Sequence, residues 1–221
     1  MIYICGMDSE QLRPQEFDVH IAEGTLRLSF VGMSNGGKSY RSKVLRNDEQ
    51  FLWYHVDEHI QKALGFDDMG AMSSWLGYPT DEYYSERERH YLELEDRFTK
   101  NASLQTNGQN LVFDTTGSVV HLPPETLSIV KETCLVVHLD VGEESLEHLI
   151  EQFFKEPKPV AWFGHYEGGE SQEEALRHSY PKLLAARLQK YRELAHINIA
   201  ASELRDKTGA ETLAVIRNHL A

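Results

Sequence analysis

Two glycines, a lysine and a serine stand at fixed spacing in the segment GMSNGGKS, residues 32–39. Gly32, Gly37, Lys38 and Ser39 satisfy the pattern G-x-x-x-x-G-K-[ST] at every fixed position. In such a loop the glycines let backbone N–H groups turn towards phosphate oxygens. The lysine reaches the β- and γ-phosphates, and the serine coordinates Mg²⁺. The spacing therefore predicts a site for the phosphates of a nucleotide.

The flanking residues fit the same interpretation. The run TLRLSFVG (25–32) predicts a strand before the loop, and SYRSKVLRNDEQ (39–50) predicts a helix after it. A helix that begins at such a loop turns its positive end towards the phosphates, and this context favours a phosphate loop over a chance glycine-rich turn. The further nucleotide contacts that we expect are Ser34, Asn35, Gly36 and Tyr40.

Apolar runs alternate with helix-like segments along the rest of the chain. The predicted strands are 25–32, 51–57, 110–117, 133–141 and 196–200. The predicted helices are 39–50, 58–65, the second half of 66–104, 143–154, 183–195 and 209–220. This order predicts an α/β fold with three layers (α/β/α) around a five-stranded parallel sheet. Ligands bind at the carboxyl ends of such strands, where 32–39, 55–57 and 114–118 fall.

Two stretches depart from this regular pattern. Residues 1–23 are polar and unpatterned, so we expect a leader or an accessory strand there, before the phosphate-loop domain over 24–221. Residues 155–175 are irregular, and we expect a mobile lid over about 153–178. The lid's aromatic side chains could close over a bound ring or pack onto the body of the protein. They are Trp162, Phe163, His165 and Tyr166.

Composition narrows the classes of partner. The chain has 221 residues and a formal net charge of −13, which argues against a nucleic-acid-binding surface. No apolar run is long enough to span a bilayer, so we expect no membrane partner. The two cysteines, Cys5 and Cys134, make a disulfide framework implausible and fit a reducing, cytoplasmic setting. We expect a monomer or a homodimer.

A phosphate loop serves several classes of protein. The segment DTTG (114–117) satisfies the D-x-x-G pattern of GTPases, but the chain has no N-K-x-D segment to recognise guanine. It is also short for most oligomeric motor ATPases. Kinases and proteins that only bind a nucleotide remain.

Beyond the loop, several segments resemble those of shikimate kinase and its relatives, over about residues 25–220. HVDEHIQKALG (55–65) is similar to the family's D-x-D-x-x-I-x-x-x-x-G, with Asp57 on the second Asp. TTGSVV (115–120) stands in the place of the family's strand-end glycine triplet on the acceptor wall, with the three glycines reduced to Thr116-Gly117-Ser118. KPV (158–160) stands where the family has an Arg-Pro pair in its lid. RLQKYRELA (187–195) places Arg187 on a substrate-binding arginine.

The chain also departs from that family. His55 replaces the first Asp of D-x-D, a magnesium-site residue in the family. Tyr84-Ser85, followed by Glu88, replaces a Phe-Arg pair whose arginine holds the shikimate carboxylate. The resemblance therefore implies the fold and the type of reaction, and we expect an acceptor other than shikimate.

Each candidate residue has an expected role in phosphoryl transfer. Asp57 would accept the proton of the acceptor hydroxyl, and Lys38 with Lys158 would neutralise charge on the phosphoryl group. Asp114, which ends a strand as a Walker B carboxylate does, would hold Mg²⁺ with Ser39. The expected acceptor contacts are Asp57, Thr116, Gly117, Ser118 and Arg187.

Plainer interpretations exist for the same residues. Asp57 could be a helix N-cap, and Asp114 a turn residue. Lys158 could be a solvated side chain and Arg187 half of a surface ion pair. His55, Asp57 and His59 share a spacing that could bind a transition metal if one strand carried all three.

These observations predict an ATP- and Mg²⁺-dependent phosphotransferase that moves the γ-phosphoryl group to a hydroxyl of a small metabolite. Two alternatives stay open. One is a nucleoside or nucleotide kinase. The other is a catalytically degenerate protein that binds ATP as a regulatory ligand, which His55 and the reduced glycine wall would explain.

Overall fold

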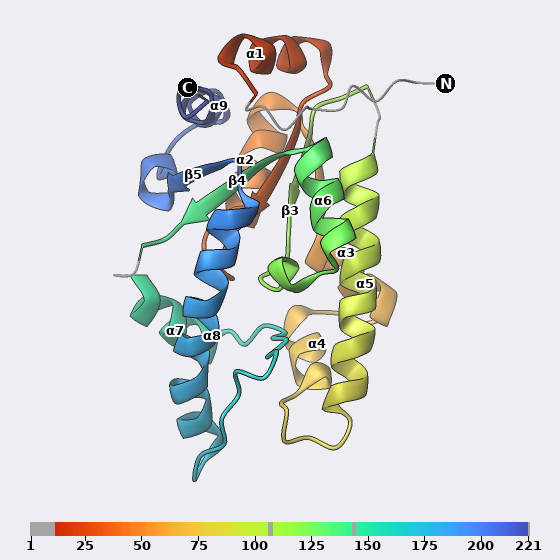
Figure 1. Cartoon of the computed structure of the whole chain (residues 1–221), viewed down its shortest axis with the longest axis vertical. Helices are drawn as coiled ribbons and strands as arrows, with labels where there is room; N and C mark the ends of the chain where they lie inside the picture. Colours follow the sequence, from red (N-terminus) through yellow and green to blue (C-terminus); the bar gives the residue numbers. More distant parts are fainter. Residues whose placement is uncertain (1–11, 106–107, 143–144, 221) are drawn as a thin grey trace.

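A parallel sheet forms the centre of the protein (Figure 1). The computed structural model describes residues 12–105, 108–142 and 145–220. The sheet has five strands in the order β2-β3-β1-β4-β5, and every neighbouring pair is parallel. The strands are β1 (Arg27–Val31), β2 (Leu52–His55), β3 (Leu111–Asp114), β4 (Leu135–Asp140) and β5 (Ile197–Ala200). The predicted fold class is confirmed.

Helices cover both faces of the sheet. Helices α1 (Pro14–Glu23), α2 (Lys38–Glu49) and α9 (Gly209–Asn218) contribute to the apolar core on one face. The core on the other face is larger. Its helices are α3 (Val56–Leu64), α4 (Met69–Leu76), α5 (Tyr84–Leu104), α6 (Pro124–Thr133), α7 (Leu146–Lys155) and α8 (Gln172–Leu194). Two short 3₁₀ turns, η1 (Val119–His121) and η3 (Ala201–Leu204), follow β3 and β5.

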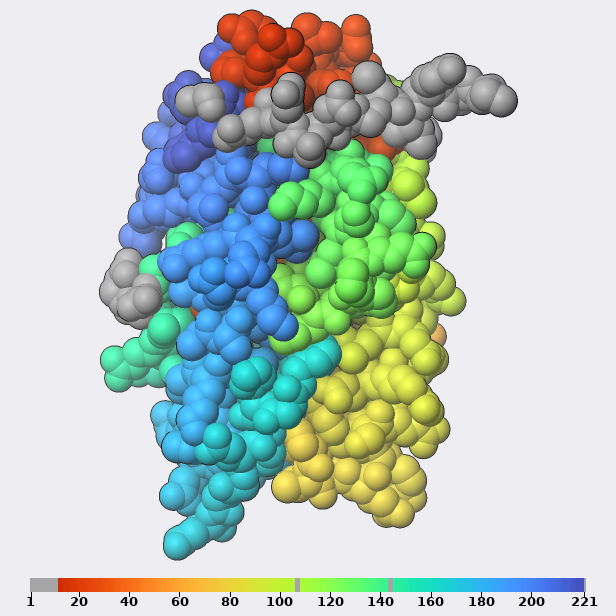
Figure 2. Space-filling view, in the orientation of Figure 1, coloured from red at the N-terminus to blue at the C-terminus, as the bar shows by residue number. Residues whose placement is uncertain are grey.

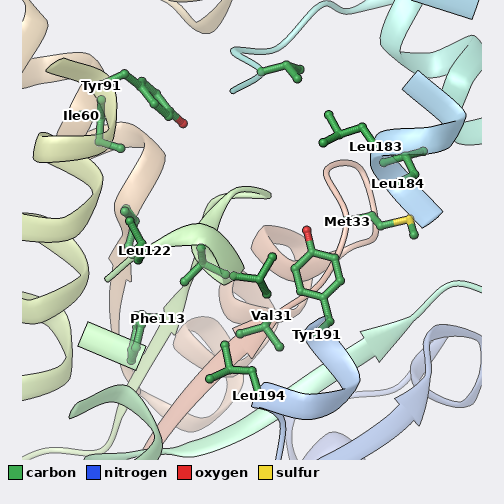
Figure 3. Close-up of a cluster of buried hydrophobic side chains, with 14 of the residues drawn as sticks. Val31, Met33, Ile60, Tyr91, Phe113, Leu122, Leu183, Leu184, Tyr191 and Leu194 are labelled. Atoms are coloured by element: carbon green, nitrogen blue, oxygen red, sulfur yellow. The ribbon is translucent and has the colours of Figure 1, made fainter. Parts of the chain in front are cut away.

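Alternate strand residues divide between the two cores, as a sheet that is covered on both sides requires. On β4, Leu135 and Val137 belong to the core beneath α2 and α9, and Val136 belongs to the opposite core. Figure 3 shows the second core, where Val31 and Phe113 from the sheet meet side chains of α3, α5 and α8. The continuous apolar runs in the sequence reflect this burial on both faces.

The N-terminal segment contains a helix. Residues 14–23, which we expected to form a leader or an accessory strand, are helix α1, and residues 1–11 lie outside the described part of the chain. Pro14 stands in the first turn, where its missing N–H costs nothing, and Gly24 ends the helix with a φ of 69°. Phe17 anchors α1 in the core. The sequence therefore marks α1 by the residues at its two ends, Pro14 and Gly24, and not by a regular spacing of apolar residues.

Strand β2 is shorter than predicted. It ends at His55, and α3 begins at Val56, so Asp57 belongs to the first turn of a helix and not to a strand. His59 lies in α3 with its ring stacked on Tyr54 at 3.9 Å between centroids. Within the described residues, no group of three His, Cys, Asp or Glu side chains could hold a metal ion. The three-residue metal hypothesis is therefore wrong.

The irregular lid segment spans 156–171, between α7 and α8. Figure 2 shows it (cyan) seated between α8 (blue) and the α4–α5 region (yellow). Trp162 is fully buried, its ring lies 5.1 Å from that of Tyr166 and 6.2 Å from that of Tyr180, and Phe163 stacks on His121 at 3.8 Å. These aromatic side chains pack onto the body of the protein.

Cys134 is a buried free thiol, as expected of a small apolar side chain in β-sheet surroundings. Burial raises the pKa of its thiol to about 11. Among the described helices, none is both long and apolar enough to cross a bilayer.

Candidate phosphoryl-transfer site

The glycine-rich loop joins β1 to α2, as the motif requires. Gly32 has a φ of 142°, and a Cβ there would lie 2.9 Å from the carbonyl oxygen of Leu139 on the neighbouring strand. Gly37 has a φ of 90° and is the N-cap of α2. Both positions therefore exclude larger residues, one through close packing and one through its backbone conformation. The loop lies at the carboxyl edge of the sheet.

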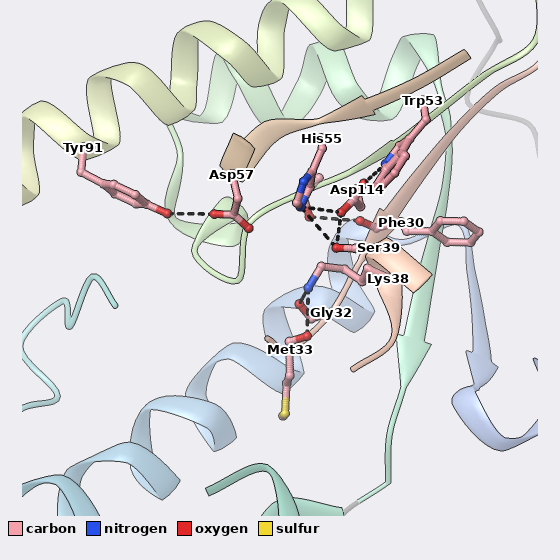
Figure 4. A network of polar contacts seen from close by, with 11 residues as sticks. Phe30, Gly32, Met33, Lys38, Ser39, Trp53, His55, Asp57, Tyr91 and Asp114 are labelled. Carbon is pink, nitrogen blue, oxygen red and sulfur yellow. Dashed lines mark hydrogen bonds and ion pairs between the residues drawn. The ribbon is translucent and has the colours of Figure 1, made fainter. Parts of the chain in front are cut away.

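Lys38 is held inside the loop (Figure 4). Its Nζ donates hydrogen bonds to the carbonyl oxygens of Gly32 (2.8 Å) and Met33 (2.9 Å), and its side chain is almost fully buried. Burial lowers the pKa of the ammonium group to about 8, against the opposing pull of Asp57 and Asp114. The charge is thus desolvated before any ligand arrives, which strengthens its attraction to a phosphate.

Ser39 and Asp114 meet at the foot of the loop. The Ser39 hydroxyl donates to Asp114 Oδ2 at 2.5 Å, and the indole N–H of Trp53 donates to Asp114 Oδ1 at 2.5 Å. Asp114 is the last residue of β3 and is fully buried, so it is not a turn residue. A hydroxyl and a carboxylate are oxygen donors that suit Mg²⁺. The pair that the sequence predicted as metal ligands is brought together.

His55 joins this pair. Its Nε2 lies 3.2 Å from Asp114 Oδ2 and 3.3 Å from Ser39 Oγ. The imidazole nitrogen is thus turned to the oxygens of both Asp114 and Ser39.

Asp57 faces the loop from the first turn of α3. His55, not Asp57, is the N-cap of that helix, so the capping interpretation is wrong. The Tyr91 hydroxyl, from α5, donates to Asp57 Oδ1 at 3.3 Å (Figure 4). Burial and the two nearby carboxylates raise the pKa of Tyr91 well above its usual value, so its proton stays available to Asp57.

Glu95, a residue that the sequence analysis did not single out, accepts hydrogen bonds from two residues of the expected acceptor wall, Thr116 and Ser118. Ser118 Oγ donates to Glu95 Oε2 at 2.7 Å, and Thr116 Oγ1 donates to Glu95 Oε1. Thr116 and Ser118 are themselves almost fully buried. Their hydroxyls therefore hold the wall in place by bonding to Glu95. Gly117, between them, is the residue that contacts the phosphate loop, since a Cβ on it would lie 2.8 Å from Ser34 Oγ.

Glu95→Gln is expected to stabilise the protein at pH 8 by about 3 kcal/mol. Burial raises the pKa of Glu95 from 4.5 to about 7, so the folded state binds this proton more tightly than the unfolded state does. The proton on Glu95 therefore contributes its full stability to the wild type below pH 4.5, and this contribution is lost as the pH rises through 7, where the advantage of Gln appears. Denaturant unfolding of both proteins at pH 5 and pH 8 measures it, with the exposed Glu93→Gln as control. A stability difference that does not change with pH would contradict the shift.

Arg187 is buried, so it is not half of a surface ion pair. Its terminal amino group donates to the carbonyl oxygen of Ala161 at 2.7 Å. Its Nε is buried and has no hydrogen-bond partner within the described part of the chain. Another guanidinium nitrogen lies 3.4 Å from where a Cβ on Gly117 would be. Arg187 thus stands directly behind the acceptor wall.

Two cavities flank the loop. The Asp57 cavity, of about 450 Å³, is lined by Asp57, Tyr91, Gly117 and Lys158 with the loop. The Arg41 cavity, of about 690 Å³, is lined by the end of β4, Arg41 and the segment after β5. The loop stands between them. The residues that line both are Asn35, Gly37, Tyr40 and His148.

Most predicted site residues line one or both cavities. Those of the Asp57 cavity are Ser34, Asn35, Gly37, Lys38, Ser39, Tyr40, Asp57, Gly117 and Lys158, and the Arg41 cavity adds Gly36. The remaining ones are Gly32, which packs on β4, Asp114, which holds Ser39, and Thr116, Ser118 and Arg187, which lie behind the wall.

At the replaced Phe-Arg pair, Tyr84 is turned inward. Its hydroxyl donates to Glu88 Oε1 at 2.5 Å, and the backbone N–H of Trp162 lies 2.8 Å from the same oxygen and donates to it. Glu88 thereby binds the lid segment. Ser85 is exposed.

No protein family model and no curated protein matches this chain. Solved structures do match. A shikimate kinase from Acinetobacter baumannii in complex with shikimate is 19% identical, with a TM-score of 0.63 over 91% of this chain and 97% of that chain. The chain has the fold of shikimate kinases. The shikimate kinase from Bacteroides thetaiotaomicron is 16% identical, with a TM-score of 0.61 over 87% and 97% of the two chains. That from Aquifex aeolicus is 20% identical, with a TM-score of 0.57 over 88% and 96%.

Proposed function

We propose that the protein is an ATP- and Mg²⁺-dependent phosphotransferase that moves the γ-phosphoryl group to a hydroxyl of a small metabolite. One observation carries this proposal: the phosphate loop, with the buried Lys38, lies between two cavities, and Asp57 faces only one of them. A nucleoside in the Arg41 cavity and an acceptor in the Asp57 cavity would meet at the loop. The fold shared with shikimate kinases supports the same reaction type.

The residues around the Asp57 cavity suit the transfer. The acceptor oxygen would bond to the γ-phosphorus as the bond from that phosphorus to the β–γ bridging oxygen breaks, and Asp57 would take the hydroxyl proton. Lys38 and Lys158 would stabilise the charge on the transferred group. Mg²⁺, held through Ser39 and Asp114, would supply further charge neutralisation.

The acceptor would be a small, hydroxylated anion other than shikimate. The positive charges of Lys38 and Lys158, which line the Asp57 cavity, and of the buried Arg187 behind Gly117 favour an anionic group there. The exposed Ser85 offers no guanidinium where the resemblance implies a carboxylate-binding arginine. The lid aromatics that would have supported a nucleoside acceptor pack onto the body instead. The free, buried Cys134 supports a reducing, cytoplasmic setting. We expect a monomer or a homodimer.

A second candidate is a catalytically degenerate ATP-binding protein. The specific observation in its favour is that His55 contacts both Asp114 and Ser39, where the related kinases are expected to carry an Asp. Such a protein would bind nucleotide at the same loop and bind no acceptor.

Thermal unfolding tests both candidates. The protein is heated with ATP, ADP or GTP, each with and without Mg²⁺, and then with ATP analogue plus a panel of hydroxylated acids that includes shikimate. A ligand at one hundred times its Kd stabilises by about 2.7 kcal/mol. A shift with ATP and a further shift with one acid supports the kinase. A shift with ATP alone supports the binder, and no shift with any nucleotide contradicts both.

A further inference from the structure

The position of His55 bears on which metal ion would bind beside the phosphate loop, because its imidazole contacts both expected metal ligands. Three side chains from three elements converge at the foot of the loop: His55 from the end of β2, Asp114 from the end of β3 and Ser39 from α2. Their donor atoms lie 2.5, 3.2 and 3.3 Å apart. Figure 4 shows the three atoms facing one another. Each residue comes from a different segment, so their meeting is a property of the fold.

These separations suit a shared metal ion. Ligands that bind one ion at about 2.0–2.1 Å, at right angles, are about 3 Å from each other. The separations found here scatter around that value. One nitrogen and two oxygens would form one face of an octahedron and leave the other positions to phosphate oxygens and water.

The imidazole is also held in place. The Trp53 ring stacks on the His55 ring at 5.4 Å between centroids, and the Trp53 indole N–H donates to Asp114 Oδ1 at 2.5 Å. One side chain therefore orients both the nitrogen ligand and the carboxylate ligand. Partners of this kind fix the direction of metal ligands and strengthen binding.

We propose that His55 Nε2 is a metal ligand and that this site selects a first-row transition-metal dication, such as Mn²⁺ or Co²⁺, over Mg²⁺. The inference rests on the nucleotide-binding function proposed above, because the phosphates would supply the remaining ligands. Mg²⁺ strongly prefers oxygen ligands, whereas an imidazole nitrogen binds transition-metal dications more tightly than it binds Mg²⁺. The Asp that His55 replaces would have favoured Mg²⁺.

The matched variants are His55→Asp, which restores an oxygen donor, and His59→Asn as control. His59 is a nearby imidazole on α3 whose ring stacks on Tyr54 and lies tilted against Phe98, and it lines neither cavity beside the loop. Pulsed electron paramagnetic resonance of Mn²⁺ reports a directly bound ¹⁴N. It is recorded with Mn²⁺ alone and with Mn²⁺ plus ADP. We expect the nitrogen coupling in the full-length protein and in His59→Asn, and its loss in His55→Asp.

A competition measurement gives the selectivity. The Mg²⁺ concentration that displaces Mn²⁺ from the ADP complex should fall about tenfold in His55→Asp relative to wild type and stay unchanged in His59→Asn. The absence of nitrogen coupling both with and without ADP would overturn the proposal, since His55 would then only bond to Asp114. So would an unchanged displacement concentration in His55→Asp.

A separate measurement of nucleotide binding distinguishes failure of the proposed function from failure of the metal inference. ADP binding is measured by thermal unfolding in EDTA, where no divalent ion takes part. If ADP stabilises the protein and Mn²⁺ shows no nitrogen coupling, the metal inference falls and nucleotide binding stands. If Mn²⁺ shows the coupling and ADP stabilises the protein neither in EDTA nor with Mg²⁺, the metal ligand stands and the kinase falls.

Discussion

Asp57→Asn is expected to lower kcat by about 10²–10⁴-fold and to leave nucleotide binding intact. The amide has the shape of the carboxylate and can keep its contact with the Tyr91 hydroxyl through Oδ1. It cannot accept the proton of an acceptor hydroxyl. Phosphoryl transfer, measured once an acceptor is identified, and the ADP-induced shift in Tm together check the expectation.

The control for Asp57→Asn is Glu58→Gln, one residue further along α3. Glu58 is exposed and pairs with Lys62 on the surface, so its loss should change neither turnover nor binding. Turnover that survives in Asp57→Asn would rule out Asp57 as the base. Loss of the ADP-induced shift in the same variant would mean that Asp57 shapes the nucleotide site instead.

Lys38→Met is expected to weaken nucleotide binding by about tenfold to a hundredfold or more, because charged hydrogen bonds are worth about 1.5–3 kcal/mol. The unliganded variant should nevertheless be at least as stable as wild type at pH 7. Burying the charged Lys38 ammonium group costs desolvation free energy in the folded state, and this cost lowers its pKa from 10.5 to about 8. A methionine fills the same space without that cost.

The sign of this effect can be tested by pH. A lowered pKa means that the folded wild type releases its proton more readily, so its stability should rise between pH 8 and 10.5, relative to Lys38→Met. Urea unfolding at pH 7 and pH 10 measures the difference. The exposed Lys43→Met, also on α2, should show neither the change in binding nor the change in pH dependence. A large loss of stability in Lys38→Met at pH 7 would contradict the desolvation account.

Some boundaries that the sequence left open were decided by packing. The run FLWYHVD is mostly apolar and β-like, but the chain turns into α3 after His55, because Val56 and Ile60 are buried on the inner face of that helix. A run of apolar residues fits a strand and the first turn of a buried helix equally well. The lid aromatics were undecided for the same reason, and burial of Trp162 between Tyr166 and Tyr180 settled their placement.

The sequence by itself determined the parts that depend on neighbours along the chain. The strand–loop–helix around Lys38, the alternation of strands and helices and the strand-end position of Asp114 all follow from local spacing, since glycine positions and apolar periods act over a few residues. Only the tertiary structure decided which distant side chains meet. Glu95 binds Thr116 and Ser118, Tyr91 reaches Asp57, and His55 contacts Ser39 and Asp114. These partners are 16 to 59 residues apart in the sequence, and no local pattern encodes how helices pack over a sheet.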